Sequence, residues 1–477
     1  MDNLNDIKTI HLIGICGTGM GTLAAMLQEA GYQVQGSDEN VYPPMSTFLT
    51  SRGILIKDGY RAENLKPPPD LVVVGNVIRR DNPEAMATLE SGLNYCSMPQ
   101  ALHRFFLNSS QSVVVAGTHG KSTTAALLVW LLTVAEMDPG CLVGGLLANF
   151  HQSYRLGKGT YFVVEGDEYD TAFFDKGPKF LHYQPKICIL TSVEFDHADI
   201  FPDLKAVESV FSRLVQSIPP DGLLIANSDD PGASRLSRQA RCPLVSYGFQ
   251  EPAHFKVERA EYGLGATRFT VSGPQGFIAS FDSPIAGAHN LSNTMAMVAL
   301  AHELDLGEET IQQTLNTFKG VRRRQEVRGE PGGVTVIDDY AHHPTAVRAT
   351  LEALRPFYGG RRLWAIFEPR TNSSKRRVFQ KRYAEVFTAA DLVLIKEPPG
   401  LERIAPEERL SARQLVEDIA ARGNEAHYFP DVDSMLPFIL ARVEPKDVLL
   451  VMSTGSFDNL IEKLLAELSN RQIQQRA

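Results

Sequence analysis

Short apolar runs alternate with helix-like segments along the first hundred residues of the chain. Apolar runs at 10–14 and 71–75 flank a helical pattern at 23–29, and a Lys-Pro-Pro-Pro breaker precedes the second run. Apolar runs bounded by turn residues and followed by helical periodicity are typical of a βα rhythm around a parallel sheet. The pattern therefore predicts an α/β domain with a parallel sheet at the start of the chain.

The same rhythm begins again at two later points. One block shows strand-like runs at 112–116, 161–164, 186–191 and 223–227, and another shows them at 334–337, 363–367, 392–395 and 448–452. Between them, at 255–282, the pattern alternates and is rich in turns, which indicates antiparallel strands attached to the second block. We predict an α/β protein with three domains: 1–109, Rossmann-like; 110–325, with a parallel sheet and a small antiparallel sheet; and 326–477, Rossmann-like.

Composition and charge narrow the class of protein. The chain has 477 residues, 43% of them hydrophobic, and roughly 150 residues per domain also suggests about three domains. The opening residues lack a basic segment followed by an apolar one, and the longest apolar stretch, at 125–134, is too short to span a bilayer. Five widely spaced cysteines favour a reducing cytosol, and a net charge of −9 argues against general nucleic-acid binding. We expect a cytoplasmic protein without membrane or nucleic-acid partners.

A glycine-rich turn in the second block predicts a phosphate-binding loop. The segment VVVAGTHGKSTT (113–124) runs from a strand through glycines into an apolar helical pattern. Glycines let backbone N–H groups turn toward phosphate oxygens, Lys121 can reach the β- and γ-phosphates, and the Ser122 hydroxyl can bind Mg²⁺. Val115 stands where the P-loop consensus has its first glycine. The predicted ATP-binding residues are Gly117, Thr118, His119, Gly120, Lys121, Ser122 and Thr123.

Carboxylates follow two of the predicted strands of this block. The run 161–164 leads into EGDEYD (165–170), and the run 187–191 leads into a segment in which His197 stands beside further acids. Ligands of open α/β sheets collect at the carboxyl ends of the strands, and carboxylate oxygens suit Mg²⁺. We select Glu165 and His197 as metal-binding and catalytic candidates.

The first domain carries a second glycine turn. Gly14, Gly17 and Gly19 lie between a predicted strand and helix, and Asp38 ends the next apolar run about twenty residues later. This fingerprint serves NAD, FAD or the pyrophosphate of a nucleotide sugar. On its own it would suggest a dehydrogenase. The P-loop about a hundred residues on makes a diphosphate ligand here and ATP in the second domain the more economical interpretation.

Three motifs together resemble the Mur ligase family throughout the chain. They are GTHGKSTT (117–124), HNLSN (289–293) and DDYAHHP (338–344). The resemblance implies an ATP-dependent ligase that activates the carboxylate of UDP-N-acetylmuramate as an acyl phosphate and joins it to an amine. Ser122 stands for the family's usual threonine, Gly166 for alanine and Thr371 for serine, and none of these changes removes a proposed ligand.

Further segments favour one branch of the family, which attaches the murein tripeptide L-alanyl-γ-D-glutamyl-meso-diaminopimelate during peptidoglycan recycling. These segments are EYDTAFFDK (168–176), EFDHADIF (194–201) and FEPRTN (367–372). The L-alanine-adding branch usually carries a Gln-Pro-His-Arg-type run at the last of them, and it is the alternative. Two alternatives come from other classes of protein: a nucleotide-dependent switch and, ranked last, a dehydrogenase.

The resemblance also implies roles for single residues. Lys121 would contact the transferring phosphates, Ser122 and Glu165 would bind one Mg²⁺, and His197 would help to hold a second. Asn290 would serve the adenine side and Asn293 the catalytic centre, while Arg324 would reach the nucleotide phosphates and Asp339 the ribose. The first domain would bind the UDP-sugar and the third domain the peptide.

Arg370 is the candidate for recognition of the peptide. It follows the strand-like run 363–367 and precedes the polar segment 371–374. A tripeptide carries several carboxylates, and an arginine fork can hold a carboxylate with two parallel hydrogen bonds where lysine offers a point charge. The position therefore predicts a contact with a peptide carboxylate.

Overall fold

The structure is a computed structural model that describes residues 6–198 and 200–476, and the side chains up to 471. The opening residues 1–5, part of the segment in which we expected no export signal, lie outside this range. The chain forms two compact units. Unit 1 contains the residues up to Val193, Val207–Tyr247 and Ala296–Thr310; unit 2 contains Glu194–Ala206, Gly248–Met295 and the residues from Ile311 onward.

The N-terminal part of unit 1 is a five-stranded parallel sheet with the order β3-β2-β1-β4-β5. Its strands are β1 (Thr9–Ile13), β2 (Gln33–Asp38), β3 (Leu55–Asp58), β4 (Leu71–Val74) and β5 (Tyr95–Ser97). The accompanying helices are α1 (Thr18–Glu29), α2 (Met45–Ser51), α3 (Pro83–Glu90) and α4 (Met98–Leu102). The side chain of Asn82 accepts hydrogen bonds from the first turn of α3, and Ser97 and Gln100 form a capping box at α4, which explains where these helices begin.

A second sheet of unit 1 has the strand order β14-β13-β12-β6-β9-β7-β8, with all neighbours parallel except β7 and β8. The strands are β6 (Gln111–Ala116), β7 (Gly140–Leu147), β8 (Gln152–Arg155), β9 (Tyr161–Gly166), β12 (Ile187–Leu190), β13 (Leu223–Asn227) and β14 (Leu244–Gly248). A hairpin, β10 (Asp170–Ala172) and β11 (Asp175–Pro178), follows β9, and the helices are α5 (Lys121–Val134), α6 (Leu204–Ser217) and α7 (Pro231–Ser237). β6 lies between β12 and β9, so the glycine turn that follows it is at the end of an interior strand of the sheet.

Unit 2 contains a six-stranded sheet with the order β18-β19-β23-β20-β21-β22, parallel except for β18. Its strands are β18 (Glu326–Gly329), β19 (Thr335–Asp339), β20 (Leu363–Phe367), β21 (Leu392–Lys396), β22 (Glu425–Phe429) and β23 (Val448–Met452). The helices of this part are α10 (Pro344–Phe357), α11 (Gln380–Ala384), α12 (Ala412–Ala420), α13 (Val432–Arg442) and α14 (Leu460–Arg476).

Three antiparallel strands also belong to unit 2: β15 (Phe255–Gly263), β16 (Ala266–Ser272) and β17 (Ile278–Ser283). Helices α8 (Ala288–Glu303) and α9 (Glu308–Thr317) have residues in both units. The alternating pattern at 255–282 predicted antiparallel strands here, because β16 and β17 each have one buried and one more exposed face.

The six-stranded sheet separates two hydrophobic cores. Every residue of β20 is buried, and its successive side chains enter different clusters: Leu363, Ala365 and Phe367 join one, while Trp364 and Ile366 join the other. Neighbouring residues of a strand point to opposite faces, so a sheet covered on both faces needs an unbroken apolar run rather than an alternating one. This explains why the sequence predicted β20 and β23 with their exact limits.

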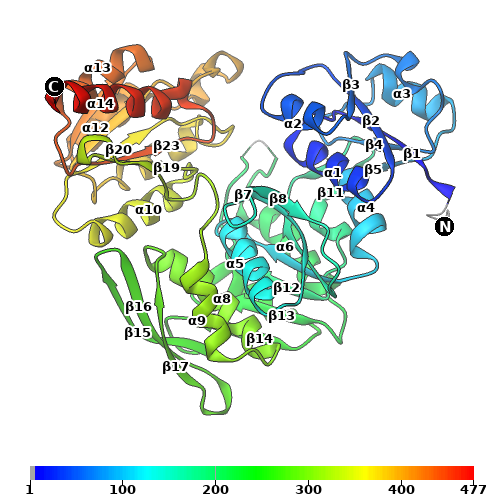
Figure 1. Cartoon of the computed structure of the whole chain (residues 1–477), viewed down its shortest axis with the longest axis horizontal. Coiled ribbons are helices and arrows are strands. Elements are labelled where there is room, and N and C mark those ends of the chain that lie inside the picture. The colour runs from blue at the N-terminus through cyan, green and yellow to red at the C-terminus, as the bar shows by residue number, and fades with distance from the viewer. Residues whose placement is uncertain (1–5, 199, 477) are drawn as a thin grey trace. The chain divides into compact units, whose positions relative to one another are not determined.

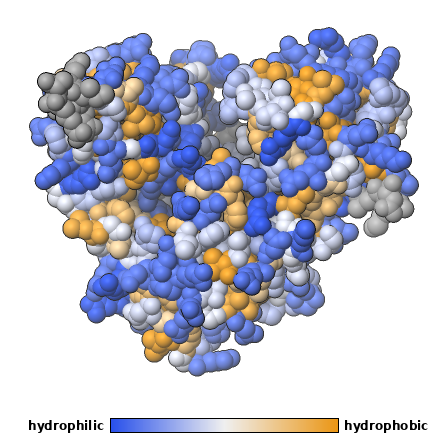
Figure 2. Space-filling view, in the orientation of Figure 1, coloured by the Kyte–Doolittle hydropathy of each residue, from blue (hydrophilic) through white to orange (hydrophobic). Residues whose placement is uncertain are grey.

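Hydrophobic and hydrophilic residues are mixed on the face of the protein that Figure 2 shows. On the face drawn in Figure 2, hydrophobic residues form separate small areas among hydrophilic ones. No helix among the described residues is long and apolar enough to cross a membrane.

The α/β class and the predicted sheets are confirmed, including the parallel sheets at both ends of the chain. The domain limits at 109 and 325 stay predictions.

Candidate active site

The glycine turn after β6 is shaped by its neighbour in the sheet, β12. Gly117 has φ of +138°, and a side chain there would meet Thr191 Oγ1 at 2.2 Å. Thr118 N donates to the Ser192 carbonyl at 2.9 Å, and His119 N donates to Ser192 Oγ at 3.0 Å. Only glycine fits such a conformation and such a close approach. The end of β12 therefore fixes the path of the turn.

The turn leads directly into helix α5. Gly120, with φ of +81°, is the N-cap residue, and Lys121, Ser122 and Thr123 form the first turn. The first backbone N–H groups of a helix have no acceptor within it, and the helix dipole adds positive potential there. The first turn of α5 contains no acidic residue. This end of α5 is thus suited to bind a phosphate, as the sequence predicted.

Lys121 lies among carboxylates that follow β9. Its Nζ donates to Glu168 Oε2 at 3.0 Å and to the Gly117 carbonyl at 2.6 Å. Burial lowers the pKa of Lys121, but Glu168 and Asp167 outweigh it, so the pKa stands above its ordinary value. Lys121 is therefore a cation held across the mouth of the glycine turn. Sequence reasoning missed Glu168 as its partner, although its place in the acidic run was a signal.

Glu165 and Ser122 offer oxygen ligands at the same edge of the sheet. Glu165 lies in β9 opposite Val115 of β6, one residue before the strand ends. Its Oε1 accepts a hydrogen bond from Gly144 N at 2.7 Å, and a side chain on Gly144 would lie 3.2 Å from its Oε2. A hydroxyl and a carboxylate are ligands that Mg²⁺ accepts. Ser122 and Glu165 would therefore supply ligands suited to Mg²⁺, and their role in binding it stays a prediction.

His197 belongs to unit 2, in the segment that follows Val193. It has φ of +55°, and its backbone N–H donates to Asp196 Oδ1 at 2.6 Å. Ala198 N donates to Ser373 Oγ at 3.2 Å. Imidazole is a less usual ligand for Mg²⁺ than oxygen. The role of His197 in holding a second ion stays a prediction.

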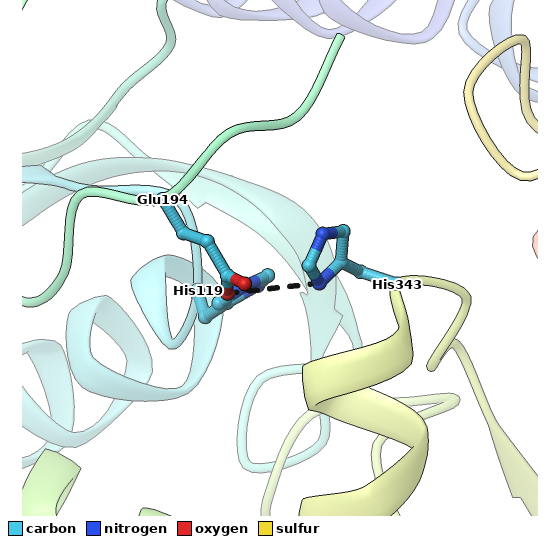
Figure 3. A group of neighbouring side chains, drawn as sticks. All are labelled: His119, Glu194 and His343. Carbon is cyan, nitrogen blue, oxygen red and sulfur yellow. Dashed lines mark ion pairs between the residues drawn. The ribbon is translucent and has the colours of Figure 1, made fainter. Parts of the chain in front are cut away.

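The beginning of the same segment is anchored to helix α10. Figure 3 shows Glu194 and His343 facing each other, with 3.7 Å between Glu194 Oε2 and His343 Nδ1. Thr345 Oγ1 donates to Glu194 Oε2 at 2.8 Å, and Arg382 also donates to Glu194. The His343 ring lies 3.3 Å from the Phe195 carbonyl. These contacts hold the backbone that carries His197.

The residues predicted for the adenine and ribose meet in unit 2. Asn290 Nδ2 donates to Gln325 Oε1 at 3.2 Å, and Asn293 Nδ2 donates to Asn290 Oδ1 at 3.3 Å. Asp339, at the end of β19, accepts hydrogen bonds from Gln325 N and from Ala341 N, both at 2.7 Å. Gln325 links the two groups, and sequence reasoning missed it because polar residues beside an arginine run look like any exposed turn.

Arg324 stacks on an aromatic ring beside this group. Its guanidinium carbon lies 5.1 Å from the centre of the Tyr340 ring. Burial raises the pKa of Asp339, and Arg324 partly opposes this. Burial also lowers the pKa of His289 to about 4, with Arg324 contributing, so His289 is a neutral imidazole at pH 7. The group thus combines one cation with amide and imidazole groups.

The N-terminal glycine turn holds Asp38 in place. Gly14 has φ of +84°, and Gly17 is the N-cap residue of α1. Asp38, at the end of β2, accepts a hydrogen bond from Cys16 N at 2.8 Å. Burial and the Asp38 charge raise the pKa of the Cys16 thiol to about 11. Asp38, from the end of β2, therefore fixes the turn that carries Gly14 and Gly17, and the role of these residues in binding a nucleotide sugar stays a prediction.

Arg370 lies just beyond the carboxyl end of β20. Its Nη1 donates to Glu368 Oε2 at 3.3 Å, and its side chain is 37% exposed. The partly exposed guanidinium is free to contact a ligand from solvent. Its role in peptide recognition stays a prediction.

Family models match the chain in three successive segments. These are the catalytic domain of the Mur ligase family at residues 9–109, the Mur ligase middle domain at 115–301, and the glutamate ligase domain of Mur ligases at 323–455. Together they cover most of the chain. The chain belongs to the Mur ligase family.

Within the family, the chain is similar to ligases of two kinds. It is 40% identical to the UDP-N-acetylmuramate–L-alanyl-γ-D-glutamyl-meso-2,6-diaminoheptandioate ligase of Haemophilus influenzae, over 97% of this chain and 99% of the relative. It is 32% identical to the UDP-N-acetylmuramate–L-alanine ligase of Alkaliphilus metalliredigens, over 97% and 98%. The crystal structure of a murein peptide ligase from Psychrobacter arcticus matches with a TM-score of 0.71 and 34% identity, over 97% and 99%.

Proposed function

We propose that the chain is an ATP-dependent amide ligase that joins the murein tripeptide L-alanyl-γ-D-glutamyl-meso-diaminopimelate to UDP-N-acetylmuramate in peptidoglycan recycling. The observation that carries this proposal is the likeness of almost the whole chain, at 40% identity, to a ligase named for these two substrates. The relative that adds L-alanine is less similar, at 32%. The distinctive run 367–372, which contains Arg370, supports the same choice.

ATP is the phosphoryl donor in this proposal. Gly117–Gly120 and the first turn of α5 would receive its phosphates through backbone N–H groups, with Lys121 as the adjacent cation. Ser122 and Glu165 would hold Mg²⁺, which supplies positive charge at the transferring phosphoryl group. Asn290 and Asn293, Arg324 and Asp339 would serve the nucleotide from unit 2.

A carboxylate resists attack by an amine because it is negatively charged and has no leaving group, and the proposed reaction removes both obstacles. An oxygen of the carboxylate attacks the γ-phosphorus of ATP, the bond to ADP breaks, and an acyl phosphate results. The free amine of the peptide then attacks the acyl carbon, the carbon–oxygen bond to phosphate breaks, and the amine nitrogen loses a proton as the amide forms. Lys121 stabilises negative charge on the moving phosphoryl group, and no enzyme nucleophile is required.

Each predicted domain would take one part of the reaction. We propose that 1–109 binds UDP-N-acetylmuramate through Gly14, Gly17, Gly19 and Asp38, that 110–325 binds ATP, and that 326–477 binds the peptide through Arg370. Glycines in the first turn permit close approach of a pyrophosphate. We place the enzyme in the cytoplasm, where ATP and nucleotide sugars are available, and without a nucleic-acid or membrane partner.

Mass spectrometry of the products tests the proposal. The purified chain is incubated with UDP-N-acetylmuramate, ATP and Mg²⁺, and with the tripeptide and L-alanine in competition at equal concentrations. We expect the UDP-N-acetylmuramoyl tripeptide as the main product. A preference for L-alanine would assign the chain to the alternative activity, and ATP hydrolysis without an amide would assign it to a nucleotide-dependent switch.

A further inference from the structure

Three buried polar residues stand at the carboxyl ends of adjacent parallel strands in unit 2. Glu368 follows β20, Lys396 ends β21 and Ser453 follows β23. They are 0%, 5% and 2% exposed. Ligands of open α/β sheets bind outside this edge, and buried charges there need partners. The cluster therefore lies where a ligand site is expected. Burying charged groups costs free energy, which indicates that the cluster has a role.

The cluster is satisfied internally, with Glu368 at its centre. Glu368 Oε1 accepts from Lys396 Nζ at 2.8 Å, and Glu368 Oε2 accepts from Ser453 Oγ at 2.7 Å. Lys396 also pairs with Asp458 at 2.9 Å. Arg370 Nη1 reaches Glu368 Oε2 at 3.3 Å. Two carboxylates thus balance two cations, and Arg370 is the cation at the exposed side of the cluster.

Most of the Arg370 guanidinium is left for another acceptor. Arginine carries five N–H donors, and among the described residues the hydrogen bond from Nη1 to Glu368 is the one that Arg370 makes. The side chain is 37% exposed, while Glu368 is fully buried. A guanidinium that is held by Glu368 on one side and exposed to solvent on the other presents N–H groups that suit a carboxylate.

Gly455 makes room for this arrangement. A Cβ atom at Gly455 would lie 2.3 Å from Arg370 Nε, 2.5 Å from Cδ and 2.6 Å from Cζ. Gly455 is not among the residues with positive φ, so its backbone would accept another residue. The absence of a side chain at this position is explained by the arginine rather than by the backbone.

Hydrogen bonds within the turn and from Arg323 fix the turn that carries Gly455. Gly455 N donates to Ser453 Oγ at 3.0 Å. Arg323 Nη2 donates to the Ser453 carbonyl at 2.7 Å and to the Gly455 carbonyl at 2.6 Å. Because Arg323 holds two carbonyl groups of the turn, a side chain at Gly455 would displace the flexible side chain of Arg370 more readily than the turn itself.

We propose that Glu368, Lys396, Ser453 and Gly455 are positioning residues that fix the guanidinium of Arg370 to receive a carboxylate of the acceptor peptide. The inference rests on the proposed function, in which Arg370 contacts the peptide. It adds that acceptor affinity depends on residues that touch no substrate. Gly455 acts by leaving space, and the Glu368 carboxylate acts by holding one edge of the fork.

A double-mutant cycle tests the inference in the full chain. Gly455→Ala, Arg370→Ala and the double variant are compared by steady-state kinetics with each substrate varied. We expect Gly455→Ala and Arg370→Ala each to raise the tripeptide KM by about 10-fold to 100-fold, because a charge-assisted pair is lost. The KM for ATP should change less than about twofold. In the Arg370→Ala background, Gly455→Ala should add almost nothing, since coupled residues are non-additive.

Gly307→Ala is the matched control. Gly307 has no atom near its missing side chain and no positive φ, so this variant should keep all kinetic constants. If Gly455→Ala lowers the yield of folded protein, Ser453→Ala replaces it, with an expected rise in tripeptide KM of about threefold that again disappears without Arg370.

The outcomes separate the two claims. An unchanged tripeptide KM in Arg370→Ala would remove Arg370 from the peptide site and overturn that part of the proposed function. Suppose that Arg370→Ala raises the tripeptide KM but Gly455→Ala either leaves this KM unchanged or adds its full effect in the Arg370→Ala background. Either result would keep the peptide assignment and overturn the positioning role. A fall in kcat alone, equal for every substrate, would also overturn it.

Discussion

At the scale of single residues, Lys121 joins structure to chemistry most directly. It stands at the start of α5 and is held by Glu168 and the Gly117 carbonyl. In the proposed reaction, ATP would have to compete with these partners for Lys121, and Lys121 would stabilise the negative charge of the transferring phosphoryl group. We expect Lys121→Ala to lower kcat by about 10²-fold to 10³-fold, the range found when a group that stabilises the transition state is removed.

Lys176→Ala is the control for Lys121→Ala, since Lys176 is 69% exposed and pairs with Asp170 in the nearby hairpin. It should retain activity. Circular dichroism and thermal melting should show that both variants fold. A folded Lys121→Ala protein with near-normal turnover would contradict the P-loop assignment.

Cys16 offers a second test at this scale, because it lies inside the N-terminal glycine turn. Burial and Asp38 raise the pKa of its thiol to about 11. At pH 8 only about 0.1% would be thiolate, which is the reactive form. We expect alkylation of Cys16 by iodoacetamide to accelerate about tenfold per pH unit from pH 8 to 10, where a free cysteine levels off. Mass spectrometry of the labelled peptide measures the rate.

The same labelling reports on ligand binding. Saturating UDP-N-acetylmuramate should slow the reaction of Cys16 at pH 9, because the sugar nucleotide would cover the turn. ATP alone should leave the rate unchanged. Equal rates with and without UDP-N-acetylmuramate would argue against the first domain as its site.

At the scale of elements, two glycines of helix α1 differ in whether the packing around them leaves room for a side chain. A side chain at Gly21 would meet Met45 Sδ at 2.4 Å, so packing alone explains that glycine. A Cβ atom at Gly19 would contact only Met98 Cε, at 3.6 Å, and Gly19 has no positive φ. Among the described residues, no contact requires a glycine at position 19, whereas the close approach of a pyrophosphate would favour one.

We therefore expect Gly19→Val to fold and to bind ATP normally but to lose measurable affinity for UDP-N-acetylmuramate. Isothermal titration calorimetry with each ligand provides the comparison, and Gly19→Ala should give an intermediate effect. Unchanged binding of the sugar nucleotide would place its pyrophosphate elsewhere.

The sequence predicted those elements whose pattern is a direct consequence of burial. Strands buried on both faces, such as β20 and β23, appear as unbroken apolar runs. The turn after β6 could be predicted because a phosphate requires glycines and a lysine at fixed spacing. The edge strands β8 and β22 escaped notice, since their mixed polar residues resemble those of loops.

Buried polar networks could not be predicted, because their partners are distant in sequence. His11 in β1, Ser37 in β2 and Glu84 in α3 meet in the N-terminal sheet, where Glu84 accepts from His11 at 2.9 Å and from Ser37 at 2.6 Å. Glu368 likewise meets Lys396 and Ser453 only once three strands align. Pattern reasoning finds the strand ends but does not show which side chains meet there.

At the scale of the whole molecule, ligation requires that an acyl phosphate survive until the amine arrives. The residues that we assign to ATP belong to both compact units and Arg370, which we assign to the peptide, belongs to unit 2, so the proposed ligation would need both units. A nucleotide-dependent switch would instead hydrolyse ATP continuously. The two classes differ in what happens when the peptide is withheld.

We expect the chain with ATP, Mg²⁺ and UDP-N-acetylmuramate but no peptide to release about one ADP per molecule and then stop, because the bound acyl phosphate would have no amine to react with. Hydroxylamine, a small nucleophile, should replace the amine and give the hydroxamate of UDP-N-acetylmuramate, which mass spectrometry detects. With the tripeptide present, ADP and amide should form in equal amounts.

EDTA should abolish all these products, because Mg²⁺ offsets the charge of the triphosphate. Steady ADP release without hydroxamate would contradict the acyl-phosphate route.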